Sequence, residues 1–146
     1  MKRSTITSIM LILTASSSLA HAMTRLHDSW DGLIVGKNGS KIRGVASMAA
    51  GKTDGTTLAE VKYKGDRAGV TRPWHVHIGS CAKGGPVLGD AKAYSVLRVA
   101  ATGDAESKAT LRLALPDSGK YYVNIHESPT NMGTIVACGD LLFGTN

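Results

Sequence analysis

Apolar and polar residues alternate along most of the chain after residue 22, and no convincing helix is found there. Residues 57–63 (TLAEVKY) show this period of two clearly. Turn residues separate the alternating runs at intervals typical of β-sandwiches and Greek-key barrels. The pattern predicts an all-β fold with about eight strands, at residues 33–35, 41–46, 57–63, 72–78, 94–101, 109–115, 121–126 and 134–143.

Two segments bear most directly on the prediction of an all-β fold. The Asn38-Gly39 pair, within the run Gly36-Lys37-Asn38-Gly39-Ser40, is a strong hairpin signal between two apolar runs. Residues 91–101 are the best helical candidate, but their Val, Tyr and Ser content argues against a helix. We therefore predict a hairpin at the first segment and a strand over 94–101.

The N-terminus has the layout of a secretory signal peptide. Lys2 and Arg3 precede a short apolar run at 6–13 (ITSIMLIL), and small residues then lead to Ala20-His21-Ala22. The apolar run is too short to span a bilayer as a helix. A short core helix is the alternative interpretation of the same residues.

Cleavage after Ala22 is expected, with residues 1–22 as the signal peptide and 23–146 as the mature domain. Cleavage after Ala20 would instead leave His21 at the N-terminus, where an amine beside an imidazole can chelate a metal. No later segment is apolar enough to cross a membrane, so the chain is predicted to be exported, either to the periplasm or by secretion.

The net charge and the two cysteines limit which classes of function the chain can have. The chain has 17 Lys and Arg residues against 11 Asp and Glu residues, a net charge of +6, and its basic residues are scattered rather than clustered. Nucleic-acid binding is therefore not supported. The two cysteines, Cys81 and Cys138, most often mean one disulfide in an exported protein, although one of them could instead be a metal thiolate.

The histidines carry the candidate chemistry. His75 and His77 lie one residue apart and so on one face of a strand, with Val76 and Ile78 on the apolar face. In YYVNIH, His126 shares a polar face with Tyr122 and Asn124, opposite Tyr121, Val123 and Ile125. If the two strands are neighbours, three neutral imidazoles converge, a set that suits copper or zinc. Taken alone, an H-x-H pair on a solvent-facing strand is more often without function, and His21 and His27 look incidental.

These motifs resemble the Cu/Zn superoxide dismutase family. The match consists of His75-Val76-His77 as paired copper ligands, His126 as the later copper ligand, and Cys81 with Cys138 as the disulfide that closes onto an A-C-G segment. The stretches are also similar to the chordin-type (CHRD) domain, through HVHIG, GPV and YVNIH. The resemblance covers roughly residues 44–142 and implies an eight-stranded Greek-key β-barrel or sandwich.

The chain also departs from the dismutase pattern. It has no histidine between Gly79 and Ile125, so the bridging histidine and the zinc ligands of the family are missing. Only eleven residues, 127–137, separate His126 from Cys138, and Ile135 takes the place of the arginine that guides superoxide to copper. The resemblance therefore implies copper without zinc, on a barrel that lacks the loops of a fast dismutase.

Three imidazoles suit Cu(I), whereas Cu(II) would need a fourth ligand from water or a side chain such as Met132 or Glu127. Asn124 could orient a ligand, and Trp74 either shields the site or packs at the end of the barrel.

We expect an exported copper-binding protein with a role in storage, delivery or tolerance. The alternatives are a copper-only superoxide dismutase, with residual activity at most, and a metal-free interaction module of the chordin type. Motifs of phosphate-binding loops, serine hydrolases and zinc proteases are absent from the sequence.

Overall fold

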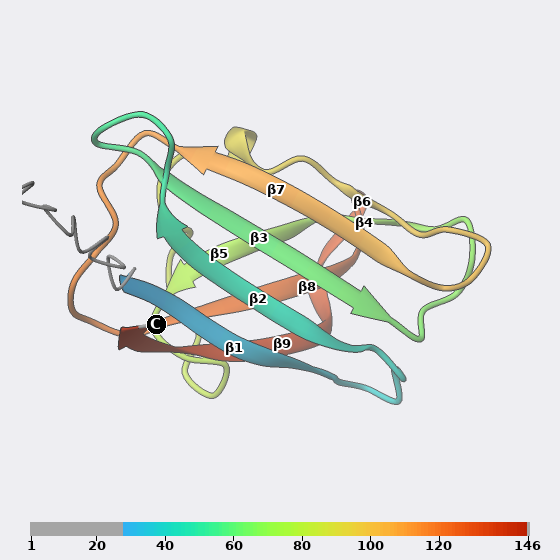
Figure 1. Cartoon of the computed structure of the whole chain (residues 1–146). Helices are drawn as coiled ribbons and strands as arrows, with labels where there is room; N and C mark the ends of the chain where they lie inside the picture. The colour runs from blue at the N-terminus through green and yellow to red at the C-terminus, as the bar shows by residue number, and fades with distance from the viewer. Residues whose placement is uncertain (1–27, 146) are drawn as a thin grey trace, which may run out of the picture.

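The computed structural model describes residues 28–145, so the predicted signal peptide, His21 and His27 lie outside the described residues (Figure 1). The described chain is all-β, as predicted. Its elements are β1 (Asp28–Gly36), β2 (Arg43–Ala50), β3 (Thr57–Lys64), β4 (Thr71–Arg72), β5 (Trp74–Ile78), a single 3₁₀ turn η1 (Ala91–Ala93), β6 (Leu97–Arg98), β7 (Ala105–Leu111), β8 (Tyr121–Ser128) and β9 (Asn131–Thr145).

One curled antiparallel sheet forms a half-barrel. Its strand order is β5-β8-β9-β1-β2-β3-β7, and β5 passes behind β3 in the view of Figure 1. The short ribbon β4–β6 contacts β8 on one side and β7 on the other, so it spans the open side between these two strands. The curl brings β5 and β8 opposite β2 and β3 across a shared core.

The hairpin between β1 and β2 has the predicted turn. Asn38 and Gly39 both have positive φ, 54° and 82°, and the N–H of Ser40 donates to the carbonyl oxygen of Lys37 at 3.0 Å. Positive φ at both central residues defines a type I′ turn, whose twist matches that of the flanking strands. The Asn-Gly pair therefore sets the register of β1 against β2.

The core lies between the two walls of the curled sheet, and its side chains follow the period of two. Val76, Val123 and Ile125 are fully buried, as predicted from alternation in β5 and β8. Trp74 packs in the core against the edge of Tyr94, at 5.1 Å between ring centroids, and donates from Nε1 to the carbonyl oxygen of Ser95. Of the two roles predicted for Trp74, the structure thus supports packing. Burying a side chain of this size contributes roughly 1.5–3 kcal/mol.

Several predicted boundaries were wrong. The strand expected at 72–78 is interrupted at Pro73, which has no N–H to donate to a ladder, and so becomes β4 and β5. The strand expected at 109–115 lies at 105–111, and only Leu97–Arg98 of the segment 94–101 is extended and paired. Ile78, expected on the core face, is 44% exposed because it is the last residue of β5.

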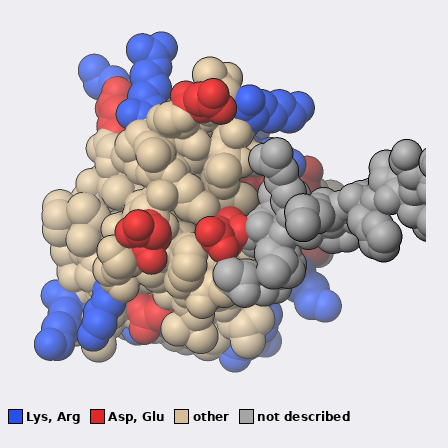
Figure 2. All heavy atoms as spheres, turned by 60° about the vertical axis from the view of Figure 1, so that its left-hand side comes forward, with Lys and Arg blue, Asp and Glu red and all other residues tan. Residues whose placement is uncertain are grey.

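Charged side chains are dispersed on the face shown in Figure 2. Lys and Arg side chains lie mainly around its margin, and Asp and Glu side chains lie between them on a largely uncharged surface. In the described part of the chain, no helix has the length and apolar character needed to cross a membrane.

Candidate metal site

Pairing of β5 with β8 brings the three predicted histidines onto one face. His75 lies opposite Asn124 and His77 opposite Tyr122 in the antiparallel register. The N–H of His126 donates to the carbonyl oxygen of Pro73 at 2.9 Å, so His126 lies diagonally across from His75. Diagonal neighbours in a sheet are within reach of aromatic side chains. The prediction that these two distant strands are neighbours is confirmed.

The three imidazoles converge. Nδ1 of His75 lies 3.2 Å from Nε2 of His126, and the ring centroids of these two residues are 5.3 Å apart. The centroid of His77 lies 5.8 Å from that of His75 and 6.2 Å from that of His126. One ring nitrogen from each histidine falls within 4.8 Å of the other two, which is close enough for a single metal ion.

His77 has a fixed orientation and one unsatisfied nitrogen. Its Nδ1 lies 3.0 Å from the carbonyl oxygen of Gly85 and must donate to it. Its Nε2 is then a lone-pair acceptor, and it is the buried side-chain polar atom of the described residues that has no hydrogen-bond partner. Leaving such an atom buried and unpaired costs about 1–3 kcal/mol, and this calls for a ligand.

His126 is oriented in the same way. Its Nδ1 donates to the carbonyl oxygen of Met132 at 2.6 Å, which leaves Nε2 as the acceptor nitrogen. Nδ1 of His75 lies 3.2 Å from Nε2 of His126. When both rings are neutral, Nδ1 of His75 therefore carries the proton and donates it to Nε2 of His126. A shift of this proton to Nε2 of His75 would free the third lone pair. In metal sites, a hydrogen bond from the second ring nitrogen to a carbonyl oxygen commonly fixes the tautomer of a histidine ligand, as the bonds to Gly85 and Met132 do here.

The electrostatics of the cluster favour neutral rings. Burial lowers the pKa of His75 to about 4, and the neighbouring His126 and His77 add to this shift. Burial also lowers the pKa of His77 and of His126, despite the opposing effect of their bonds to backbone carbonyl oxygens. All three rings are therefore unprotonated at neutral pH, the form in which imidazole binds metals.

Two tyrosines enclose the cluster. Tyr122 stacks on His77 with ring centroids 5.0 Å apart, and the edge of Tyr94 contacts His75 at 5.2 Å. His77 and His126 are 8% and 6% exposed, whereas His75 is half-buried, so solvent reaches the cluster on the side of His75. Asn124, predicted to orient a ligand, makes a side-chain hydrogen bond to Tyr122.

Sequence reasoning missed a buried arginine behind His126. Arg72 donates two hydrogen bonds to the carboxylate of Asp66, and its Nη1 donates to the backbone carbonyl oxygen of Glu127. The same Nη1 lies 3.2 Å from the Glu127 carboxylate. The sequence predicts Arg72 only as the first residue of the expected histidine strand, and residue spacing does not encode its partners Asp66 and Glu127.

The predicted disulfide is present. Cys81 and Cys138 are bonded, with their Cα atoms 6.0 Å apart, so neither is a thiolate ligand. The N–H of Cys81 also donates to the Asp140 carboxylate at 2.7 Å. These bonds attach the loop after β5, which carries the Gly85 carbonyl, to β9.

The group of converging ligand atoms consists of the three histidines, without a carboxylate. The Glu127 carboxylate instead faces Arg72. Met132 contributes its carbonyl oxygen to His126, while its side chain is exposed, so a thioether ligand from Met132 stays a prediction. Ile135, at the position of the guide arginine in the resemblance, pairs with His126 across β8 and β9.

No protein-family model matches the chain, and no curated protein sequence matches it significantly. The resemblance to dismutases and chordin-type domains rests on the sequence motifs alone.

Proposed function

We propose that this chain is an exported copper-binding protein on a superoxide dismutase-like Greek-key barrel, with His75, His77 and His126 as the ligands of one copper ion. The observation that carries the proposal is the buried Nε2 of His77, which has no hydrogen-bond partner and lies where two other imidazole nitrogens converge. The strand order, in which β3 pairs with β7 and β5 with β8 after long connections, supports the barrel.

The donor set fits copper better than the alternatives. Three neutral nitrogens with no carboxylate or thiolate are a poor match for Mg²⁺ or Ca²⁺, which prefer oxygen, and a structural zinc site would normally have a fourth protein ligand. Among divalent ions, copper has the highest affinity for nitrogen sites, and three imidazoles also suit Cu(I). When bound, copper would supply one-electron redox chemistry; the chain itself holds the ligands in place and limits access of water.

The environment supports storage or delivery rather than rapid superoxide turnover. Arg72 is the cation behind His126, but it is buried and its charge is matched by Asp66 and Glu127, so it cannot attract an anion. The half-buried His75 still leaves an opening for a small molecule. A copper-only dismutase is therefore the second candidate.

The disulfide is in keeping with an oxidising, extracytoplasmic compartment.

Metal titration tests the proposal. Purified protein should bind one equivalent of Cu(I) in a chelator competition, and the variant His75→Ala/His77→Ala/His126→Ala should lose this binding. His27→Ala, which changes the other histidine of the predicted mature chain, is the matched control and should bind as the wild type does. Undiminished binding by the triple variant would remove the proposal.

Two further measurements separate the alternatives. A superoxide-consumption rate above that of an equal amount of free copper would favour the dismutase. Absence of any copper-dependent rise in thermal stability would favour the metal-free chordin-type module, because a ligand that binds only the native state must stabilise it.

A further inference from the structure

An aromatic pocket, lined by Trp30, Tyr121 and Phe143, lies at the end of the half-barrel where β1 begins and β9 ends, on the left in Figure 1. Its volume of about 510 Å³ is in the range of small-molecule sites. The buried ring of Trp30 meets the ring of Tyr121 edge-on at 4.8 Å between centroids, and that of Phe143 at 5.1 Å. Phe143 pairs with Trp30 across β1 and β9 but stays 39% exposed, so its ring is open to a ligand.

The loop before β8 keeps the ring of Tyr121 accessible. The hydroxyl of Tyr121 donates to the carbonyl oxygen of Ser118 at 3.2 Å, which holds the ring in place. Gly119 lies beside that ring with a φ of +115°, and a Cβ at this position would come within 3.1 Å of the ring atom Cε2. A side chain at residue 119 would therefore cover the ring, and its backbone conformation would be strained. With glycine there, the ring is fixed and open.

The wall of the aromatic pocket also carries charges of both signs. Asp117 and Asp140 contribute carboxylates, and Lys120 contributes an ammonium group. In the described part of the chain, none of these three groups forms an ion pair, because the ion pairs there join other residues. The N–H of Cys81 donates to Oδ1 of Asp140 and positions that carboxylate. Unpaired charges of opposite sign around one cavity complement a ligand that itself carries both signs.

We propose that the aromatic pocket binds a small zwitterion whose cationic end is a trimethylammonium group. Aromatic rings attract a cation that lies within about 6 Å of the ring centroid, and the carboxylates of Asp117 and Asp140 add to this attraction. Lys120 binds the anionic end of the ligand. A trimethylammonium group has no N–H and so suits an aromatic wall, whereas a primary ammonium ion would lose hydrogen bonds to water there.

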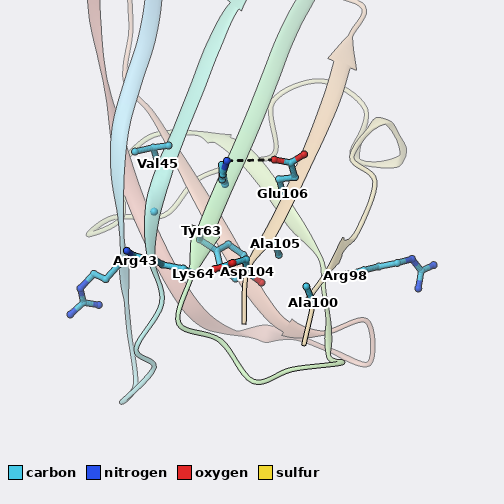
Figure 3. Close-up of a pocket in the computed structure, with 11 residues that line it drawn as sticks. Arg43, Val45, Tyr63, Lys64, Arg98, Ala100, Asp104, Ala105 and Glu106 are labelled. Carbon is cyan, nitrogen blue, oxygen red and sulfur yellow. Dashed lines mark ion pairs between the residues drawn. The ribbon is translucent and has the colours of Figure 1, made fainter. Parts of the chain in front are cut away.

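A second pocket, drawn in Figure 3, has the opposite charge. Its volume is about 720 Å³, and its charged lining consists of four basic side chains and two acidic ones: Arg43, Lys62, Lys64, Arg98, Asp104 and Glu106. Glu106 is joined to Lys62 at 3.9 Å, as the dashed line shows. Its aromatic residue, Tyr63, is only 3% exposed. Excess positive charge and a covered ring both disfavour a trimethylammonium group, so this pocket serves as the internal control.

Calorimetric titration with glycine betaine and with phosphocholine tests the proposal, on chelator-treated protein because the pocket contains none of the three histidines. At least one ligand should bind with a dissociation constant below about 1 mM. The carbon isostere 3,3-dimethylbutanoate, which lacks the cation, and glycine, which lacks the methyl groups, should each bind about tenfold more weakly or worse. Tighter binding of phosphocholine would indicate a lipid headgroup as the source, and tighter binding of betaine a free solute. Failure of both to bind overturns the proposal.

Four variants assign the two ends of the ligand. Phe143→Leu, which keeps apolar volume but removes a ring, and Asp117→Asn should each weaken binding about fivefold or more. Lys120→Met should weaken binding of glycine betaine but not of choline, which has no anionic group. Asp104→Asn, in the pocket of Figure 3, is the matched control and should bind as the wild type does. Thermal melting verifies that each variant folds, and the exposed Asp117 and Lys120 keep the test valid if Phe143→Leu does not. Wild-type affinity in the Asp117 and Lys120 variants overturns the proposal.

Discussion

Arg72 holds the carboxylate of Asp66 in a bidentate ion pair, with Nε 2.9 Å from Oδ2 and Nη2 2.8 Å from Oδ1. Both side chains are buried. Burial opposes the ionisation of Asp66, but hydrogen bonds from Arg72, from the N–H of Arg67 and from Tyr63 outweigh it and lower the pKa of this carboxyl. Because Nη1 of Arg72 also binds the carbonyl oxygen of Glu127, the pair anchors β8 one residue after His126.

This anchor lies where the β8–β9 ladder is irregular. The register shifts on both sides of His126, and Glu127 has no partner in the register. Arg72 satisfies the Glu127 carbonyl from outside the ladder, and the carbonyl oxygen of Pro73 accepts from His126. Two consecutive residues just before the His75 strand therefore hold the third histidine in position.

Arg72→Met should destabilise the protein by about 3–5 kcal/mol, because it leaves the Asp66 charge buried without a partner. Arg72→Met/Asp66→Asn should recover part of this loss while still lacking the donor to Glu127. Urea unfolding measures the stability of both, and copper titration of the folded double variant should show weaker binding than the wild type. Lys108→Met, which breaks an exposed pair with Glu60, is the control and should leave the free energy of unfolding nearly unchanged, because solvent screens an exposed ion pair.

A double variant that binds copper as tightly as the wild type would show that the ion pair only stabilises the fold. Because the wild type is titrated in parallel, this outcome is distinct from a failure of copper binding itself.

His77→Phe should abolish copper binding while leaving the fold intact. The substitution removes the buried, unpartnered Nε2 but also the bond from Nδ1 to Gly85, so in chelator-treated protein the change in stability should be small, about 1 kcal/mol in either direction. Copper should raise the melting temperature of the wild type and leave that of the variant unchanged. Equal copper-dependent shifts in both proteins would exclude His77 as a ligand.

Much of the candidate site could be predicted from sequence because it depends on local periodicity. Alternation placed His75 with His77 and His126 with Asn124 and Tyr122, and the structure bears out both faces. Arg72 was missed because its partner Asp66 and its acceptor Glu127 come from a loop and from another strand. No periodicity encodes such a contact; only the fold brings these residues together.

The fold was predictable where side chains are large or turns are specific, and less so elsewhere. Asn38-Gly39 gave the correct hairpin because few residues tolerate positive φ twice in succession. The position of β7 was wrong because its inward residues at 105 and 109 are alanines, which give a weak apolar signal between Glu106 and Lys108. Strand order was beyond local analysis, since β3–β7 and β5–β8 pair over long separations.

Gly85→Ala should affect both stability and copper binding. A Cβ at this position would lie 1.7 Å from the carbonyl oxygen of Ile78, so the loop must move, and the carbonyl that orients His77 moves with it. We expect a loss of about 1–3 kcal/mol by urea unfolding, together with weaker copper binding. Gly133→Ala is the matched control, because a Cβ there meets nothing within 4 Å. Equal behaviour of the two variants would contradict the proposed role of the Gly85 carbonyl.

The depressed pKa values of the histidines predict how stability changes with pH. The pKa of His75 is about 4 in the folded protein against an ordinary value of 6.5, and those of His77 and His126 shift in the same direction. Between pH 6.5 and 4 the unfolded chain therefore binds more protons than the folded one, so the free energy of unfolding falls as the pH is lowered through this range. His75 accounts for at most about 3 kcal/mol, and less where solvent screens its half-buried ring.

Urea unfolding of chelator-treated protein at a series of pH values measures this loss. His75→Gln should flatten the dependence, because glutamine does not titrate. The contribution of Asp66, whose pKa is lowered, is lost only as the pH falls below the ordinary carboxyl range, so the two effects occupy different windows. A wild-type stability that is constant from pH 6.5 to 4.5 would mean that the three rings take up protons in the folded state, and the cluster would then be neither buried nor neutral enough to bind a metal as proposed.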